Sequence, residues 1–185
     1  MFKRVSPATR GGLAKNIVFA GVAAGIVLGT VPAKAEVCVD PAARAALELR
    51  VLQSEFMVSA LTCGQKSSYN AFVTTFEPFL KMQGGQLRSF FTKAYGPKAG
   101  AERLNRTVTR LANVASQNSL TGAAQDYCSA SKARFTAVLK STSKDLALMA
   151  RTNPSAKAHG YKSCVEMAER NNGAEDVTPT PQGVN

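Results

Sequence analysis

The sequence predicts an all-α protein, a helical bundle of four main helices plus short ones, braced by two disulfides. Apolar residues recur at helical spacing in several segments, and prolines and glycines mark where those segments begin and end. No run alternates apolar and polar residues between hairpin turns, so no strand is predicted. The four cysteines all follow the first 35 residues: Cys38, Cys63, Cys128 and Cys164.

The two ends of the chain differ in composition from its middle. Residues 1–35 combine basic residues, an apolar run and an Ala-Lys-Ala site, so we expect a signal peptide cleaved after Ala35. The alternative is an uncleaved signal that anchors the protein in the inner membrane. Residues 171–185 are polar and contain prolines and glycines, so we expect a disordered tail. Residues 36–170 then form one helical, disulfide-braced domain.

The first predicted helix runs from Pro41 to Thr62. Proline suits the first turn of a helix, and Asp40 is a favourable N-cap residue. At 100° per residue the apolar side chains fall on two nearly opposite arcs, which is typical of a central helix with neighbours on both sides. One arc holds Leu47, Val51, Val58 and Leu61, and the other holds Leu49, Leu52, Phe56, Ala60 and Cys63. Polar residues, including Glu48 and Glu55, lie between the arcs.

The remaining helices follow in order. A short helix begins at Ser67, and Pro78 opens a longer one that ends before Gly96, with Gly84 and Gly85 weakening its middle. The next helix spans about 98–118, and another starts after Gly122. Residues 146–149 either continue that helix or form a separate turn, and a last short helix is predicted around 163–170.

The cysteines favour two structural disulfides in an oxidising compartment, because no spacing suits a zinc site. Cys38 and Cys63 flank a helix roughly 33 Å long, so they cannot bond to each other. Two pairings remain. If the next two helices form one kinked arm, Cys63 pairs with Cys128 and Cys38 with Cys164, which is the pairing we prefer. If the two arms reverse direction, Cys38 pairs with Cys128 and Cys63 with Cys164.

Basic residues gather in one part of the sequence. Without the five basic residues of the signal, the chain holds 18 basic and 12 acidic residues, a net charge of +6. Six of the basic residues are candidates for binding an anionic lipid, polysaccharide or protein: Arg88, Lys93, Lys98, Arg103, Arg106 and Arg110. The simpler interpretation is a solvated helix face. Nucleic acid is not an expected partner, because no recognised binding motif is present.

Signals for catalysis are few, and they favour a non-enzymatic protein. Glu48 and Glu55 lie two turns apart and could serve a small hydrolase or lyase as an acid–base pair. A structural pairing with arginines, such as Arg50 or those of a neighbouring helix, is the simpler interpretation. No phosphate-binding loop or metal-ligand cluster is present, so neither cofactor nor metal is expected. A secreted inhibitor or chaperone with an exposed apolar groove is a third interpretation.

Three segments together resemble a group of small exported bacterial helical proteins of unknown function. The segments are LRVLQSEFMVSALTC, YNAFVTTFEP and LANVASQNSL, and the resemblance covers about Val37 to Cys128. It implies an exported helical domain with cysteines on both sides of the first helix. The resemblance implies no reaction, ligand or partner.

Overall fold

A computed structural model describes residues 36–174, with side chains described to residue 170. The predicted signal peptide, residues 1–35, lies outside the described residues, and so does the tail from 175 onward. The last helix continues to Ala174, past the expected boundary at 170. A reciprocal cap begins it, because the Ser163 N–H donates to Glu166 and the Glu166 N–H donates to the Ser163 hydroxyl. Once the first turn has formed, each further residue adds one backbone hydrogen bond for the conformational entropy of a single residue, so the helix can extend beyond residue 170.

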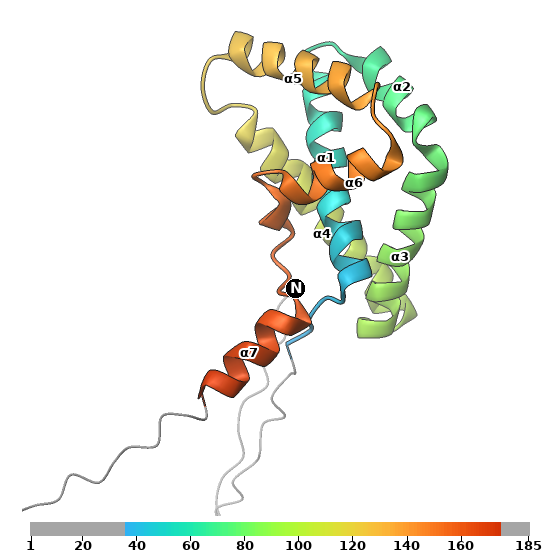
Figure 1. Cartoon of the computed structure of the whole chain (residues 1–185), viewed down its shortest axis with the longest axis vertical. Helices are drawn as coiled ribbons and strands as arrows, with labels where there is room; N and C mark the ends of the chain where they lie inside the picture. The colour runs from blue at the N-terminus through green and yellow to red at the C-terminus, as the bar shows by residue number, and fades with distance from the viewer. Residues whose placement is uncertain (1–35, 175–185) are drawn as a thin grey trace, which may run out of the picture. The chain divides into compact units, whose positions relative to one another are not determined.

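The described residues form an all-α fold, which confirms the predicted fold class (Figure 1). Within this range the only β pairing is an isolated bridge between Val39 and Ser163. The elements are α1 (Pro41–Thr62), α2 (Lys66–Thr75), α3 (Glu77–Tyr95), α4 (Pro97–Asn118), α5 (Ala124–Val138), α6 (Ser143–Thr152), the 3-10 helix η1 (Ala156–His159) and α7 (Cys164–Ala174).

Helix α1 is the central element, as its two apolar arcs predict. It packs against α2, α3, α4, α5, α6 and η1. Asp40 caps it by accepting a hydrogen bond from the Ala43 N–H at 2.8 Å. Both arcs are buried except at Cys63, which is half-buried, and at Leu61, which is 61% exposed. Leu61 was expected in the core, but it lies in the last turn of α1, where no other element covers it.

The core consists of two clusters along α1. One joins α1 to α2 and α5 through aromatic contacts, with Phe56 centred 5.1 Å from Phe72 and 4.8 Å from Phe135. The same cluster includes Leu146 and Ala150 of α6. The other joins the start of α1 to α3 through Leu47, Leu87 and Phe91. The two clusters therefore hold opposite ends of α1 against different neighbours.

The approach of α3 to α4 is closest near the turn that joins them. A Cβ atom on Gly100 would lie only 2.5 Å from the Phe91 carbonyl oxygen, so this contact requires glycine. Away from that point the two helices diverge, α3 toward α2 and α4 toward α5 (Figure 1). The divergence leaves a wedge between them, with α1 at its base.

Helix α6 is separate from α5, which settles the alternative that the sequence left open. Thr142 and Asp145 form a reciprocal cap in which the Asp145 N–H donates to the Thr142 hydroxyl and the Thr142 N–H donates to the Asp145 carboxylate. This cap starts a new helix after the chain turns at residues 139–141.

The structure pairs Cys38 with Cys164 and Cys63 with Cys128, the preferred of the two predicted arrangements. The Cα atoms are 4.8 Å and 5.4 Å apart, respectively. As the preferred pairing required, α2 and α3 run away from Cys63 and α4 returns, so that α5 starts beside it (Figure 1). The two disulfides indicate an oxidising compartment.

Candidate functional site

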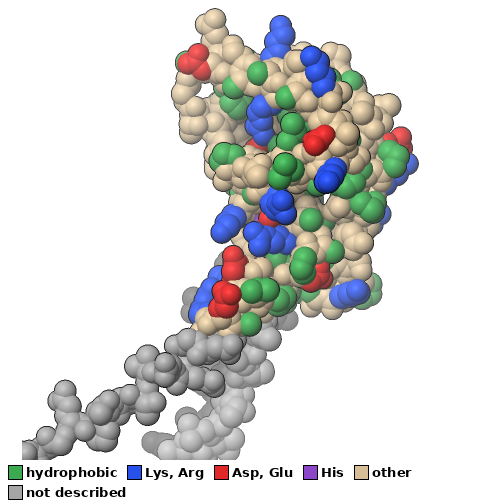
Figure 2. Space-filling model, in the orientation of Figure 1, with side chains coloured by type: hydrophobic (Ala, Val, Ile, Leu, Met, Phe, Trp, Pro, Cys, Tyr) green, Lys and Arg blue, Asp and Glu red, His purple; other side chains and the backbone are tan. Residues whose placement is uncertain are grey.

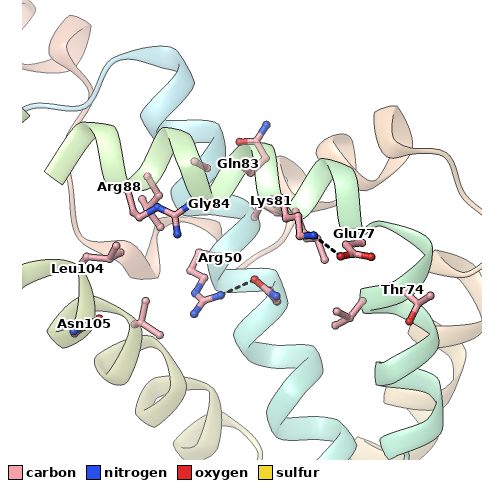
Figure 3. Close-up of a pocket in the computed structure, with 16 residues that line it drawn as sticks. Arg50, Thr74, Glu77, Lys81, Gln83, Gly84, Arg88, Leu104 and Asn105 are labelled. Atoms are coloured by element: carbon pink, nitrogen blue, oxygen red, sulfur yellow. Dashed lines mark hydrogen bonds and ion pairs between the residues drawn. The ribbon is translucent and has the colours of Figure 1, made fainter. Parts of the chain in front are cut away.

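A cavity of about 500 Å³ occupies the wedge between α3 and α4; we refer to it as the α3–α4 pocket (Figure 3). It lies where the two core clusters meet, since its lining includes Leu49 of one and Leu87 of the other. Its volume falls within the usual range for small-molecule sites. The lining comes from α1 (Ala46, Leu49, Arg50, Gln53), α2 (Val73, Thr74), α3 (Glu77, Leu80, Lys81, Gln83, Gly84, Leu87, Arg88) and α4 (Leu104, Asn105, Val108).

Arg50 is the most unusual side chain in this lining. It is half-buried, and one of its terminal NH₂ groups donates to the Gln53 side-chain oxygen at 2.8 Å. Its Nε–H is buried without a hydrogen-bond partner among the described residues. Burial lowers the pKa of Arg50, an effect opposed by Tyr69. Since arginine ordinarily titrates far above neutral pH, the guanidinium remains charged.

A second unpartnered polar atom belongs to another lining residue, Gln83, whose amide points away from Arg50 (Figure 3). The side-chain oxygen of Gln83 is buried and has no partner among the described residues. No other buried side-chain nitrogen or oxygen in the described part of the chain is unpartnered. Buried polar groups almost always find a partner, so two exceptions on residues of one lining make this pocket the candidate site.

The charges around the pocket are mostly positive. Arg50, Lys81 and Arg88 face a single acidic residue, Glu77. Glu77 pairs with Lys81 one helical turn away, and the hydrogen bond from Lys81 lowers the pKa of Glu77 (Figure 3). Arg50 and Arg88 form no ion pair within residues 36–170. The pocket therefore carries excess positive charge.

Gly84 leaves one wall of the pocket open. A Cβ atom built at this position would meet no atom within 4 Å, and α3 is continuous through Gly84 and Gly85. The sequence suggested only that this glycine pair weakens the helix. Neither Gly84 nor Arg50 was predicted from the sequence to line a pocket. Arg50 could have indicated one, because an arginine on a helix that is covered on both sides needs a polar partner.

The structure does not bring the six predicted basic residues onto one surface. Arg88 lines the pocket, whereas Arg110 donates to the carbonyl oxygens of Ala158 and His159 at 2.8 Å and 2.6 Å. Arg110 is therefore committed to holding η1 against α4. All six side chains are exposed. Arg88 and Arg110 nevertheless lie at different sites, one in the lining of the pocket and the other against η1.

The other four lie together in the last turn of α3 and the first three turns of α4; we call them the α3–α4 basic end. They are Lys93, Lys98, Arg103 and Arg106. Arg103 stacks over the Tyr95 ring at 4.8 Å, and Arg106 pairs with Glu102 at 3.8 Å. Lys93 and Lys98 form no ion pair within residues 36–170.

Basic residues on the opposite part of the bundle are more dispersed. Figure 2 shows Lys and Arg side chains scattered over the face that carries α5 and α6, separated by apolar and neutral groups. This arrangement is typical of an ordinary solvated surface.

Glu48 and Glu55 are both engaged by arginines, as the structural interpretation expected. Glu48, 3% exposed, accepts a hydrogen bond from Arg44 at 2.8 Å. Glu55 accepts hydrogen bonds from Arg134 of α5 and from Asn153, each at 2.9 Å. Arg50, which was suggested as a partner, instead faces the pocket. Each carboxylate therefore has an arginine partner.

A second cavity of about 500 Å³ lies between α1, α4, α5 and α6. Glu55, Arg134 and Asn153 line it, but their hydrogen bonds are made to one another.

Exposed large hydrophobic residues of the described part of the chain lie on five separate segments: Leu61, Met82, Leu120, Leu148 and Val165. Their dispersal does not favour a single apolar groove.

Within residues 36–174 the protein has neither a cluster of metal-ligand side chains nor a helix suited to crossing a membrane. No three His, Cys, Asp or Glu side chains in this range lie close enough to hold a metal ion. None of the helices there is both long and apolar enough to cross a membrane.

No family model, curated protein or solved structure matches this chain. The resemblance to small exported bacterial proteins therefore stays a prediction. The function must be argued from the charges, cavities and contacts of the protein itself.

Proposed function

We propose that the protein is a non-enzymatic binding protein, exported to the periplasm or beyond the cell, that docks on an anionic envelope component through the α3–α4 basic end. The main support for this proposal is the local excess of positive charge. One end of the bundle carries Lys93, Lys98, Arg103 and Arg106. Glu102 is the only acidic residue between Lys81 and Arg110. The two disulfides support an oxidising compartment.

Electrostatic docking fits this site better than a tight, specific interface. The four side chains are exposed, and an acidic lipid or polysaccharide presents many equivalent negative groups to them. Each Lys or Arg near an anionic membrane contributes about 1 kcal/mol to binding. This attraction decays over a Debye length of roughly 10 Å at 0.1 M salt, so it weakens steeply as salt is added.

Co-sedimentation with lipid vesicles and retention on an acidic polysaccharide column test the proposal. We expect binding to phosphatidylglycerol vesicles or to the column at low salt, and release at high salt. A variant with Lys93→Gln, Lys98→Gln and Arg103→Gln should bind about two orders of magnitude more weakly, because each lost charge removes about 1 kcal/mol and about 1.4 kcal/mol corresponds to a tenfold change.

The matched control removes three positive charges elsewhere, with Lys132→Gln, Lys140→Gln and Lys144→Gln on or near α5 and α6. Equal weakening by both triple variants would mean that only net charge matters, which would refute the assigned surface. Absence of binding to both anionic materials at low salt would refute the function itself.

A further inference from the structure

We infer that the α3–α4 pocket binds a small amphipathic anion, a molecule with one carboxylate or phosphate head and an apolar tail. This site is separate from the basic end. On α4 the pocket-lining residues Leu104, Asn105 and Val108 and the row Arg103, Arg106 and Arg110 fall on different flanks at helical spacing. Only Arg88, among the six predicted basic residues, lines the pocket.

The negative head follows from Arg50. Its buried Nε–H lacks a partner, while the neighbouring Gln53 already holds the guanidinium in place from one side. Burying an arginine charge is costly, and an anion that accepts hydrogen bonds from the free part of the guanidinium offsets this cost. Arg88 adds a second positive charge to the same lining. Glu77 does not compete for Arg50, because it is paired with Lys81.

The apolar tail follows from the rest of the lining. Aliphatic side chains from all four helices contribute to it: Ala46, Leu49, Val73, Leu80, Leu87, Leu104 and Val108. Because these residues come from both core clusters, an apolar chain entering the wedge would lie against the protein core rather than on its surface. A small inorganic ion would leave this apolar lining unused.

The pocket is kept open by backbone features rather than by long side chains. Gly100 holds α3 and α4 together at one end of the wedge, and Gly84 leaves its wall without a side chain. The second cavity provides a contrast, since its charged groups bond to one another. The excess positive charge and the unpartnered atoms are found together only in the α3–α4 pocket among the described residues.

Isothermal titration calorimetry on the purified, disulfide-bonded protein tests this inference with defined probes. Decanoate and decyl phosphate carry a head and a tail, decanol lacks the charge, and inorganic phosphate lacks the tail. We expect one equivalent of decanoate or decyl phosphate to bind, and both decanol and inorganic phosphate to bind at least tenfold more weakly. The stronger of the two anions identifies the head group.

Two variants locate the binding. Gly84→Leu places a side chain in the cavity and should abolish binding, whereas Gly85→Leu, which has the same helix-propensity gain but lies outside the lining, should leave it unchanged. Arg50→Gln should weaken decanoate binding about tenfold or more while leaving decanol binding unchanged. The melting temperature of each variant establishes that it is folded.

Several results would overturn the inference: no binding of either anion, equal affinity for decanol, or decanoate binding that survives Gly84→Leu. The variant with Lys93→Gln, Lys98→Gln and Arg103→Gln separates this site from the proposed docking surface. It should lose vesicle binding and keep decanoate binding. Loss of both in that variant would refute the independence of the pocket.

Discussion

Individual glutamates and one histidine illustrate how much a residue's surroundings determine its role. Glu48 and Glu55 share a helix and a spacing of two turns, yet Glu48 pairs with a residue of its own helix and Glu55 with residues of α5 and of the loop after α6. His159 is 3% exposed, and its Nδ1 accepts a hydrogen bond from the Tyr161 N–H at 3.1 Å. The neutral imidazole therefore carries its proton on Nε2.

The pH dependence of stability should report on His159, the only histidine of the chain. Burial lowers the pKa of His159; Glu48 opposes this shift, Arg44 and Arg110 add to it, and Glu166 weakly opposes it. An unfolded chain, with a histidine pKa of about 6.5, then binds more protons than the folded protein. This contribution to stability is complete above about pH 6.5 and is lost as pH falls through the folded-state pKa.

We expect the melting temperature to fall between pH 7.5 and pH 5, and to fall less in the variant His159→Gln. Thermal unfolding followed by circular dichroism across this range measures the difference. Parallel pH profiles for the two proteins would contradict the role assigned to this buried imidazole.

At the scale of elements, the contact between α3 and α4 depends on a single glycine. Gly100→Ala should destabilise the protein, because a Cβ atom 2.5 Å from the Phe91 oxygen forces the helices apart. Overpacking costs about 1–3 kcal/mol, which outweighs the gain of up to about 1 kcal/mol that alanine brings to a helix. Urea unfolding measures the net change.

Gly84→Ala is the matched control for this substitution, since it meets no atom within 4 Å and should stabilise the protein by up to about 1 kcal/mol. If both substitutions stabilise the protein, the close contact at Gly100 is not needed for the α3–α4 arrangement.

Helix positions were largely predictable because their signals are local. Asp40 and Pro41 begin α1, Pro78 lies in the first turn of α3, and Gly96 ends it with a positive φ of 79°. The pocket was not predictable in the same way. Its polar atoms come from different helices, and its existence depends on how far α3 and α4 diverge beyond Gly100, which no local pattern encodes.

At the scale of the whole molecule, the preferred disulfide pairing followed from one assumption about topology, that α2 and α3 act as one arm. An arginine of a neighbouring helix was expected to pair with Glu55, but its identity as Arg134 could not be foreseen, because the two residues lie 79 positions apart and meet only after the whole bundle has closed. The division of the six basic residues between the pocket, η1 and the α3–α4 basic end was not predictable for a similar reason: helical spacing places residues on a face, but not in relation to a neighbouring helix.

Opening the inner disulfide should lower stability without changing the fold. Cys63→Ala with Cys128→Ala removes a cross-link between residues 65 positions apart, and such links typically contribute about 2–4 kcal/mol. We expect a lower urea midpoint with an unchanged helical circular dichroism spectrum. Cys38→Ala with Cys164→Ala opens the outer link alone and provides the comparison; an unchanged midpoint in either variant would show that its link does not stabilise the fold.

The nested disulfides also determine what a protease could do to this molecule. The inner link, Cys63–Cys128, lies entirely within the segment that Cys38–Cys164 closes. A single cut at any peptide bond between Cys38 and Cys164 therefore opens a ring but releases no fragment. A nicked protein would remain one covalent molecule until its disulfides were reduced, an advantage for a small protein among the hydrolases of an oxidising compartment.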